Sequence, residues 1–143
     1  MSRAYRVLAG LIALLVLVQA AAVTYGAFTV DKTVDKAKDH GDTVAHASGA
    51  LDGGLGYALH SVVGMVIIPV VALLLVVVSV LLRERTALTW AALIAADVAV
   101  QVALGQAAHS VPALGWLHGP NALVLLTLAG YTARPRTRRT QPA

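Results

Sequence analysis

The 143-residue sequence contains no cysteine. This absence excludes disulfide bonds, thiolate metal sites, iron–sulfur clusters and the thioether attachment of c-type haem. Any haem would have to be b-type, held by side chains without a covalent link. The motifs of soluble enzymes are missing too, because there is no phosphate-binding loop, no nucleophile elbow and no pair of catalytic carboxylates.

Charge is also scarce, since only 13% of the residues are charged while 58% are hydrophobic. The mean hydropathy is +0.76. A soluble domain carries about a quarter charged residues. The composition therefore predicts an integral membrane protein whose partner is the lipid bilayer.

The few charges are sharply grouped along the chain. The three lysines share one segment with most of the aspartates, and this acidic segment alternates with clusters of arginine. By the positive-inside rule, the arginine ends are cytoplasmic, so we expect both termini on the cytoplasmic side of the plasma membrane. The net positive charge is then explained by the orientation of the chain in the membrane, and no nucleic-acid partner is expected. The arginine clusters are Arg3 and Arg6, Arg83 and Arg85, and Arg134, Arg136, Arg138 and Arg139.

Four apolar segments are each near or above the roughly 20 residues that cross a bilayer. Short connections force antiparallel neighbours, so we predict an all-α, antiparallel four-helix bundle. The chain would form a single transmembrane domain, residues 1–143, with no evident internal repeat. The predicted spans are residues 7–30, 57–82, 87–108 and 113–133, with an outer loop at 31–56 and a basic cytoplasmic tail at 134–143.

The N-terminus allows a second interpretation. Arg3 and Arg6, the apolar residues 8–18 and the alanines 20–22 also describe a cleavable signal peptide. The apolar stretch continues to Val30, however, which is long for a signal peptide and suits a span. Cleavage would leave three spans.

Two histidines lie just inside the outer ends of predicted spans: His60 on the second and His118 on the fourth. Lipid offers an imidazole no hydrogen-bond partner, so such residues need a specific role. On a bundle they can face each other and hold a haem iron as axial ligands. Gly64 and Ala122 each follow one turn later on the same face, which keeps that face small enough for a flat macrocycle.

A comparison of the depths of the histidines in the membrane indicates an alternative iron ligand. Along ideal helices, His60 lies about 34 Å from Arg83 and His118 about 24 Å from Arg134. His109, at the end of the third span, matches the depth of His60 better. His109 is therefore kept as an alternative iron ligand.

The third span carries a polar stripe at four-residue spacing, which must turn into the bundle. Its members are Asp97, Gln101, Gly105 and His109. Asp97 lies near mid-span, where we expect it to be protonated or hydrogen-bonded. For Asp97 we favour an interhelical hydrogen bond, and the alternative is a proton relay or a contact with quinone. Gln19 on the first span is expected to make a similar interhelical bond.

The stretch QVALGQAAHSVPALGWLHGPNALVLLTL, residues 101–128, resembles half of a haem A synthase. That family has a Gln-x-x-Leu-Gly element on one span, a short outer loop, and a His-x-x-x-Ala element on the next. The run from His60 to Gly64 occupies the place of the family's earlier histidine. The resemblance covers three spans, with the first matched weakly through Gln19. The chain is also similar to small bacterial four-span membrane proteins without an assigned function.

The resemblance implies that His60 and His118 are axial haem ligands, with Gln101 and Gly105 lining the site. The chain departs from the family in three ways: it has one four-helix half instead of two, it lacks the outer cysteine pair of some members, and Ser61 stands where arginine is usual. The hydroxylating chemistry is therefore not carried over, and an electron-transfer protein is expected rather than an enzyme.

Two hypotheses follow from the sequence. The first is a b-type haem protein with bis-histidine ligation near the outer face, passing electrons between a quinone and an outer acceptor or redox partner protein. The alternative is a non-haem small membrane subunit or a proton-coupled transporter that uses Asp97, which at this size would form a homo-oligomer.

Overall fold

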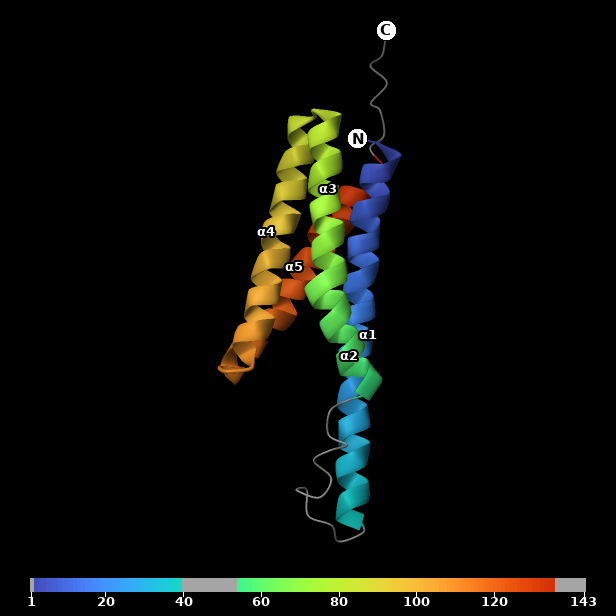
Figure 1. Ribbon diagram of the computed structural model, residues 1–143, viewed down its shortest axis with the longest axis vertical. Coiled ribbons are helices and arrows are strands. Elements are labelled where there is room, and N and C mark those ends of the chain that lie inside the picture. Colours follow the sequence, from blue (N-terminus) through green and yellow to red (C-terminus); the bar gives the residue numbers. More distant parts are fainter. Residues whose placement is uncertain (1, 40–53, 136–143) are drawn as a thin grey trace. The chain divides into compact units, whose positions relative to one another are not determined.

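The computed structural model describes residues 2–39 and 54–135, and over these residues the chain is helical and contains no strand. The all-α class predicted from the sequence is therefore confirmed. The elements, labelled in Figure 1, are α1 (Arg3–Asp39), α2 (Gly54–Val62), η2 (Val63–Ile67), α3 (Ile68–Leu82), α4 (Arg85–Ala108), η3 (Pro112–Leu114) and α5 (Gly115–Ala133).

Three of these helical segments are long and apolar enough to cross a membrane: α1, the continuous stretch from α2 to α3, and α4. They correspond to the first three predicted spans. The fourth predicted span forms α5, which has 19 residues. It does not meet the same criterion, because its first turns carry polar residues and a proline, including His118, Pro120 and Asn121.

Helix α1 is longer than the sequence suggested. It has 37 residues and continues through Asp39, whereas the predicted span ended at residue 30. The added turns carry acidic and basic side chains at neighbouring positions of the helix surface, which supports the helix. One such pair is Lys38 and Asp35, whose charged atoms lie 3.6 Å apart on an exposed face. The outer loop predicted at 31–56 thus begins later. Residues 40–53 of that loop, and 136–143 of the predicted tail, lie outside the described residues.

The second helical segment contains a π-helical turn, η2, which ends two residues before Pro69. The backbone N–H of Ile68 donates to the carbonyl of Val63, one residue further back than in an α-helix. Proline has no N–H and its ring crowds the preceding turn, so the wider turn lets the helix pass the proline without ending.

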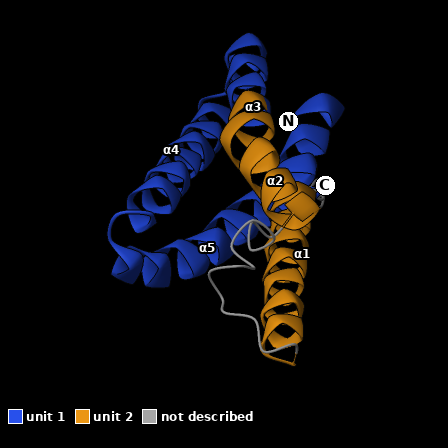
Figure 2. Cartoon of the chain, turned by 60° about the horizontal axis from the view of Figure 1, so that its bottom comes forward, with its two compact units in different colours: residues 1–13, 71–143 blue, residues 14–70 orange. Residues whose placement is uncertain are grey.

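The chain divides into two compact units, shown in Figure 2. Unit 1 comprises residues 1–13 and 71–143, and unit 2 comprises residues 14–70. Unit 1 therefore holds the start of α1, most of α3, and α4, η3 and α5. Unit 2 holds the rest of α1, α2 and η2.

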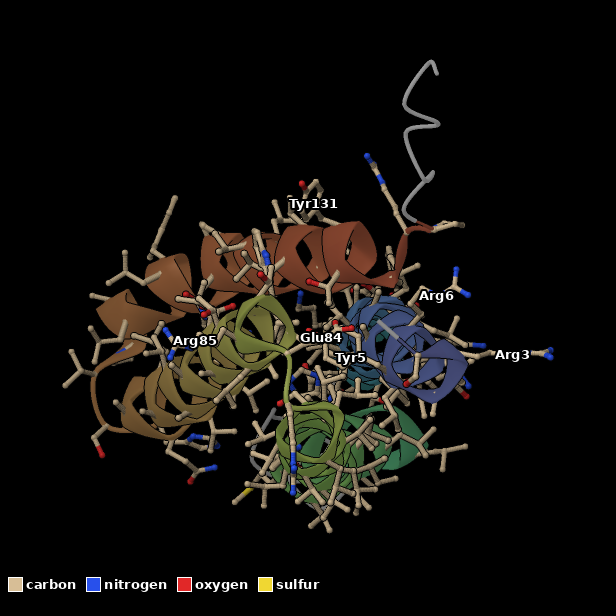
Figure 3. The ribbon with its side chains drawn as sticks, turned by 90° about the horizontal axis from the view of Figure 1, so that it is seen from above. Arg3, Tyr5, Arg6, Glu84, Arg85 and Tyr131 are labelled. Atoms are coloured by element: carbon tan, nitrogen blue, oxygen red, sulfur yellow. The ribbon has the colours of Figure 1, made fainter. Side chains whose placement is uncertain are left out.

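Within unit 1, the beginnings of α1 and α4 and the end of α5 meet. The fully buried Tyr5 donates its hydroxyl hydrogen to the carbonyl of Ala87 at 2.9 Å. A methyl group on Gly10 would lie 3.6 Å from Cβ of Ala133. Because Tyr5 contacts Ala87 and Gly10 faces Ala133, the described members of all three arginine clusters lie at the same end of unit 1. Figure 3 looks down on that end, with Arg3, Arg6 and Arg85 labelled.

Replacing Tyr5 with phenylalanine tests this junction. The change removes one buried hydrogen bond, so the free energy of unfolding in detergent should fall by about 0.5–1.5 kcal/mol. Tyr25 is 59% exposed, and Tyr25→Phe is the matched control, which should leave stability unchanged. Equal unfolding curves for Tyr5→Phe and the wild type would show that the Tyr5 hydroxyl does not fasten α1 to α4.

Candidate functional site

In unit 2, Gln19 on α1 and His60 on α2 form a reciprocal pair. The Gln19 side-chain Nε2 donates to the backbone carbonyl of His60 at 3.0 Å. In return, His60 Nδ1 lies 3.3 Å from the backbone carbonyl of Gln19. A carbonyl oxygen can only accept, so this bond places the hydrogen on Nδ1. Gln19 is 9% exposed, and its contact fulfils the interhelical hydrogen bond expected for it.

In unit 1, Gln101 on α4 and His118 on α5 form a second pair of the same kind. Gln101 Nε2 donates to the His118 carbonyl at 3.1 Å, and His118 Nδ1 donates to the Gln101 carbonyl at 3.1 Å. Gln101 Nε2 also lies 3.2 Å from His118 Nε2. Since Nδ1 carries the hydrogen, Nε2 accepts in that contact.

The two units therefore contain the same four-atom arrangement, a repeat that the sequence does not display. In each unit a glutamine on one helix binds the histidine backbone, and the histidine ring binds the glutamine backbone. The residues are 41 apart in unit 2 but 17 apart in unit 1, so no fixed period marks the motif. The expectation of no internal repeat missed it for this reason.

This arrangement selects one tautomer of each imidazole. With Nδ1–H bonded to a backbone carbonyl, the lone pair is on Nε2. Histidines that bind metals commonly have this form, because the carbonyl fixes the ring and makes the other nitrogen a better donor to the metal. Each imidazole thus has the tautomer in which Nε2 can bind a metal ion, but the Nε2 lone pair of His118 accepts the Gln101 amide hydrogen in this structure, and a metal would have to displace that hydrogen bond.

Two glycines lie directly against these pairs. A Cβ atom on Gly105 would be 3.1 Å from Cε1 of His118, and one on Gly64 would be 2.6 Å from Nε2 of Gln19. Both positions need to be small so that the paired side chains fit between the helices. The space beside Gly64 therefore holds the Gln19 amide, and the macrocycle-facing role expected from its spacing stays a prediction. Ala122 is half-buried one turn after His118.

His109, the alternative ligand, has a different setting. It caps the end of α4, is exposed, and its Nδ1 donates to the carbonyl of Gly105 in its own helix at 3.0 Å. This is a local bond that a histidine at a helix end makes without a partner helix. The structure therefore separates His109 from the interhelical pairs of His60 and His118.

A further side chain, Asn121 on α5, extends the pair of unit 1. Its Nδ2 donates to Gln101 Oε1 at 2.8 Å. Asp97 precedes Gln101 by one turn on α4, and the interhelical bond expected for Asp97 stays a prediction. Its second carboxyl oxygen, Oδ2, is buried and has no partner among the described residues. The sequence analysis missed Asn121, although it comes one turn after His118 and so shares its face.

Among residues 2–39 and 54–135, no three histidine, aspartate or glutamate side chains gather in a group that could hold a free metal ion. Haem iron needs fewer protein ligands, because the porphyrin provides four nitrogens and the protein one or two axial donors. Comparisons with protein-family models, curated proteins and solved structures find no match for this chain.

Proposed function

We propose that this chain is a b-type haem-binding integral membrane protein that transfers electrons, with His60 and His118 as the axial ligands. The single observation that carries the proposal is the repeated Gln–His pair. In both units the imidazole Nδ1 is bonded to a carbonyl of the neighbouring helix, which places the lone pair on Nε2. At His118, iron would replace the Gln101 amide hydrogen that this lone pair accepts. Two such histidines are what bis-histidine ligation requires.

The surroundings of the pairs fit this group. The glutamine amides tie each histidine backbone to a second helix, which restrains the ring on which an iron would depend. Bound haem would supply one-electron redox chemistry, and two axial histidines favour electron transfer over oxygen chemistry because no position at the iron stays open. His60 is preferred to His109 because, among residues 2–39 and 54–135, the hydrogen bond of the His109 ring goes to Gly105 in its own helix.

The membrane setting is part of the proposal. The arginine clusters at one end of unit 1 support a plasma-membrane protein with that end, and both termini, in the cytoplasm. In this orientation His60 and His118 lie toward the outer face of the membrane. Electrons would come from a quinone in the bilayer or pass to a redox partner protein.

The test is a dithionite-reduced minus oxidised absorption spectrum of the detergent-purified full chain, with a pyridine haemochrome assay for stoichiometry. We expect sharp α and Soret bands of low-spin b-type haem, at about one haem per chain. A colourless protein from cells supplied with haem precursor would overturn the proposal.

One observation favours a second function. Asp97 Oδ2 is buried without a partner among the described residues, and a carboxyl group in that position can take up and release a proton. If the protein is colourless, a proton-coupled transporter or a small subunit of a larger assembly becomes the better interpretation, with Asp97 as its functional residue. A homo-oligomer would then be expected from the small size of the chain.

A further inference from the structure

One end of unit 1 carries a patch of positive charge. Its arginines come from the start of α1, the connection from α3 to α4, the start of α4 and the end of α5, and these segments meet in unit 1. Among the described residues at this end, Glu84 is the one acidic side chain, and no ion pair joins the arginines to another described residue. The arginine patch consists of Arg3, Arg6, Arg83, Arg85 and Arg134, three of which are labelled in Figure 3.

Arg6 is packed against the protein although its charge is not paired. The residue is half-buried, and its Nε atom is buried without a hydrogen-bond partner among the described residues. A side chain held in this way has already lost part of its freedom, so less entropy is lost when it binds an anion. Arginine can bind a phosphate through two N–H groups at once, and the unsatisfied N–H of Arg6 is a donor for such a contact.

Arg83 has a backbone conformation that disfavours an arginine. It follows the last residue of α3 with a φ of 54°, in the left-handed region, and its N–H donates to the carbonyl of Val80 at 3.0 Å. Helices commonly end on a glycine in this conformation, because a Cβ atom makes it costly. A strained residue that glycine could replace indicates that its side chain has a role of its own.

We propose that the arginine patch binds anionic glycerophospholipids through their phosphodiester headgroups, with Arg6 and Arg83 among the contacts. Basic residues where membrane helices reach the cytoplasm bind such headgroups. A lipid fits better than free phosphate, because apolar side chains beside the patch are open to acyl chains: Val7 is 60% exposed and Leu81 is 74% exposed. The proposal rests on the membrane setting of the proposed function and is independent of haem.

The two tryptophans of the chain lie toward opposite ends of unit 1 and can report on it. Trp90 lies about 7.5 Å along α4 from Arg85 and packs on Tyr131 with ring centres 5.1 Å apart. Trp116 is 84% exposed at the start of α5, about 27 Å along that helix from Arg134. Replacing either tryptophan with phenylalanine leaves the other as the single reporter.

The test places each single-tryptophan variant of the full chain in vesicles of phosphatidylcholine and phosphatidylglycerol, with bromine on the acyl chains of one lipid at a time. Bromine quenches tryptophan fluorescence on contact, so the ratio of the two quenching values measures which lipid lies beside the ring. We expect Trp90 to favour phosphatidylglycerol by at least about fivefold, the attraction of one arginine near an anionic surface. Trp116 should show no preference.

High salt separates direct contact from diffuse attraction. In about 1 M sodium chloride the screening length is about 3 Å, so only charges in direct contact still interact strongly. The preference of Trp90 for phosphatidylglycerol should persist under these conditions. A preference that disappears would show that anionic lipid is attracted by the overall positive charge, which overturns the proposed site.

Variants of the patch test the two named contacts. Arg6→Gln and Arg83→Gly should each lower the Trp90 preference by about fivefold. Arg83→Gly should also keep or raise the unfolding temperature in detergent, since glycine adopts the left-handed conformation without strain. Lys32→Gln is the matched control, because it removes the same charge from an exposed position about 39 Å further along α1, and it should change nothing.

Equal quenching of Trp90 by the two lipids overturns the proposal. A preference that Trp116 shares, or that Lys32→Gln lowers as far as Arg6→Gln does, overturns it as well. The haem proposal is tested separately by the absorption spectrum. A colourless protein that keeps the Trp90 preference overturns haem binding alone, and a red protein without the preference overturns the lipid site alone.

Discussion

His118→Ala should remove haem from the protein. The variant lacks one of two axial nitrogens, and because losing a group that merely supports a ligand costs tenfold to a hundredfold, losing the ligand should cost at least about a hundredfold in haem affinity. His60→Ala should behave the same way. Absorption spectra of membranes and a pyridine haemochrome assay of the purified variants measure the effect.

The controls are chosen from the same chain. His109→Ala should keep full haem, because within the described part of the chain the His109 ring hydrogen-bonds Gly105 of its own helix and no residue of another helix. Asp97→Asn should keep it too, because asparagine has nearly the size of aspartate and Asp97 is not one of the proposed ligands. Added imidazole should restore the low-spin spectrum to His118→Ala, which distinguishes a missing ligand from an unfolded protein. Full haem in His118→Ala, together with loss in His109→Ala, would show that His109 is the ligand.

Gly56→Ala should separate α1 from α2 and disturb the pair of unit 2. A Cβ atom on Gly56 would collide with the backbone nitrogen of Gly26 and lie 2.6 Å from the backbone oxygen of Ala22. Both obstacles are backbone atoms of α1, so no side chain can turn away to relieve the contact. Overpacking of this kind costs about 1–3 kcal/mol, which should appear as a lower free energy of unfolding in detergent.

The same substitution should reach the candidate site. Gly56 lies one turn before His60 on α2, and Ala22 lies one turn after Gln19 on α1, so moving the helices apart stretches the Gln19–His60 bonds. Haem content should fall along with stability. Gly130→Ala is the matched control, because no atom lies within 4 Å of the added carbon, and it should change neither property. Equal effects of the two variants would mean that α1 and α2 do not depend on close backbone contact at Gly56.

Several features of the fold could be predicted from sequence because they depend on local composition. Long apolar runs require helices where backbone groups have no water to bond, and this gives the all-helical class and three helices able to cross a membrane. The boundaries were less predictable. Helix α1 continues through Asp39 because charged residues can extend a helix beyond the apolar run, so hydropathy marks the end of the apolar segment and not the end of the helix.

The candidate site shows the same division. His60, His118 and Gln101 stand out in sequence because polar side chains are costly among apolar neighbours. Asn121 did not, since at the opening of α5 it follows Gly119 and Pro120 and looks like an ordinary residue of a helix start. Its bond to Gln101 depends on how α5 is rotated against α4, which the order of residues alone does not specify.

The sequence by itself determined the helical class, the apolar segments, the grouping of arginines and the exceptional histidines, because each follows from the polarity of residues close together in the chain. Only the tertiary structure decided the partners: Gln19 with His60, and Gln101 with His118 and Asn121. A hydrogen bond between helices requires both the right rotation and the right height of each helix. Those are set by packing between segments far apart in sequence, such as the contact of Gly56 with Gly26.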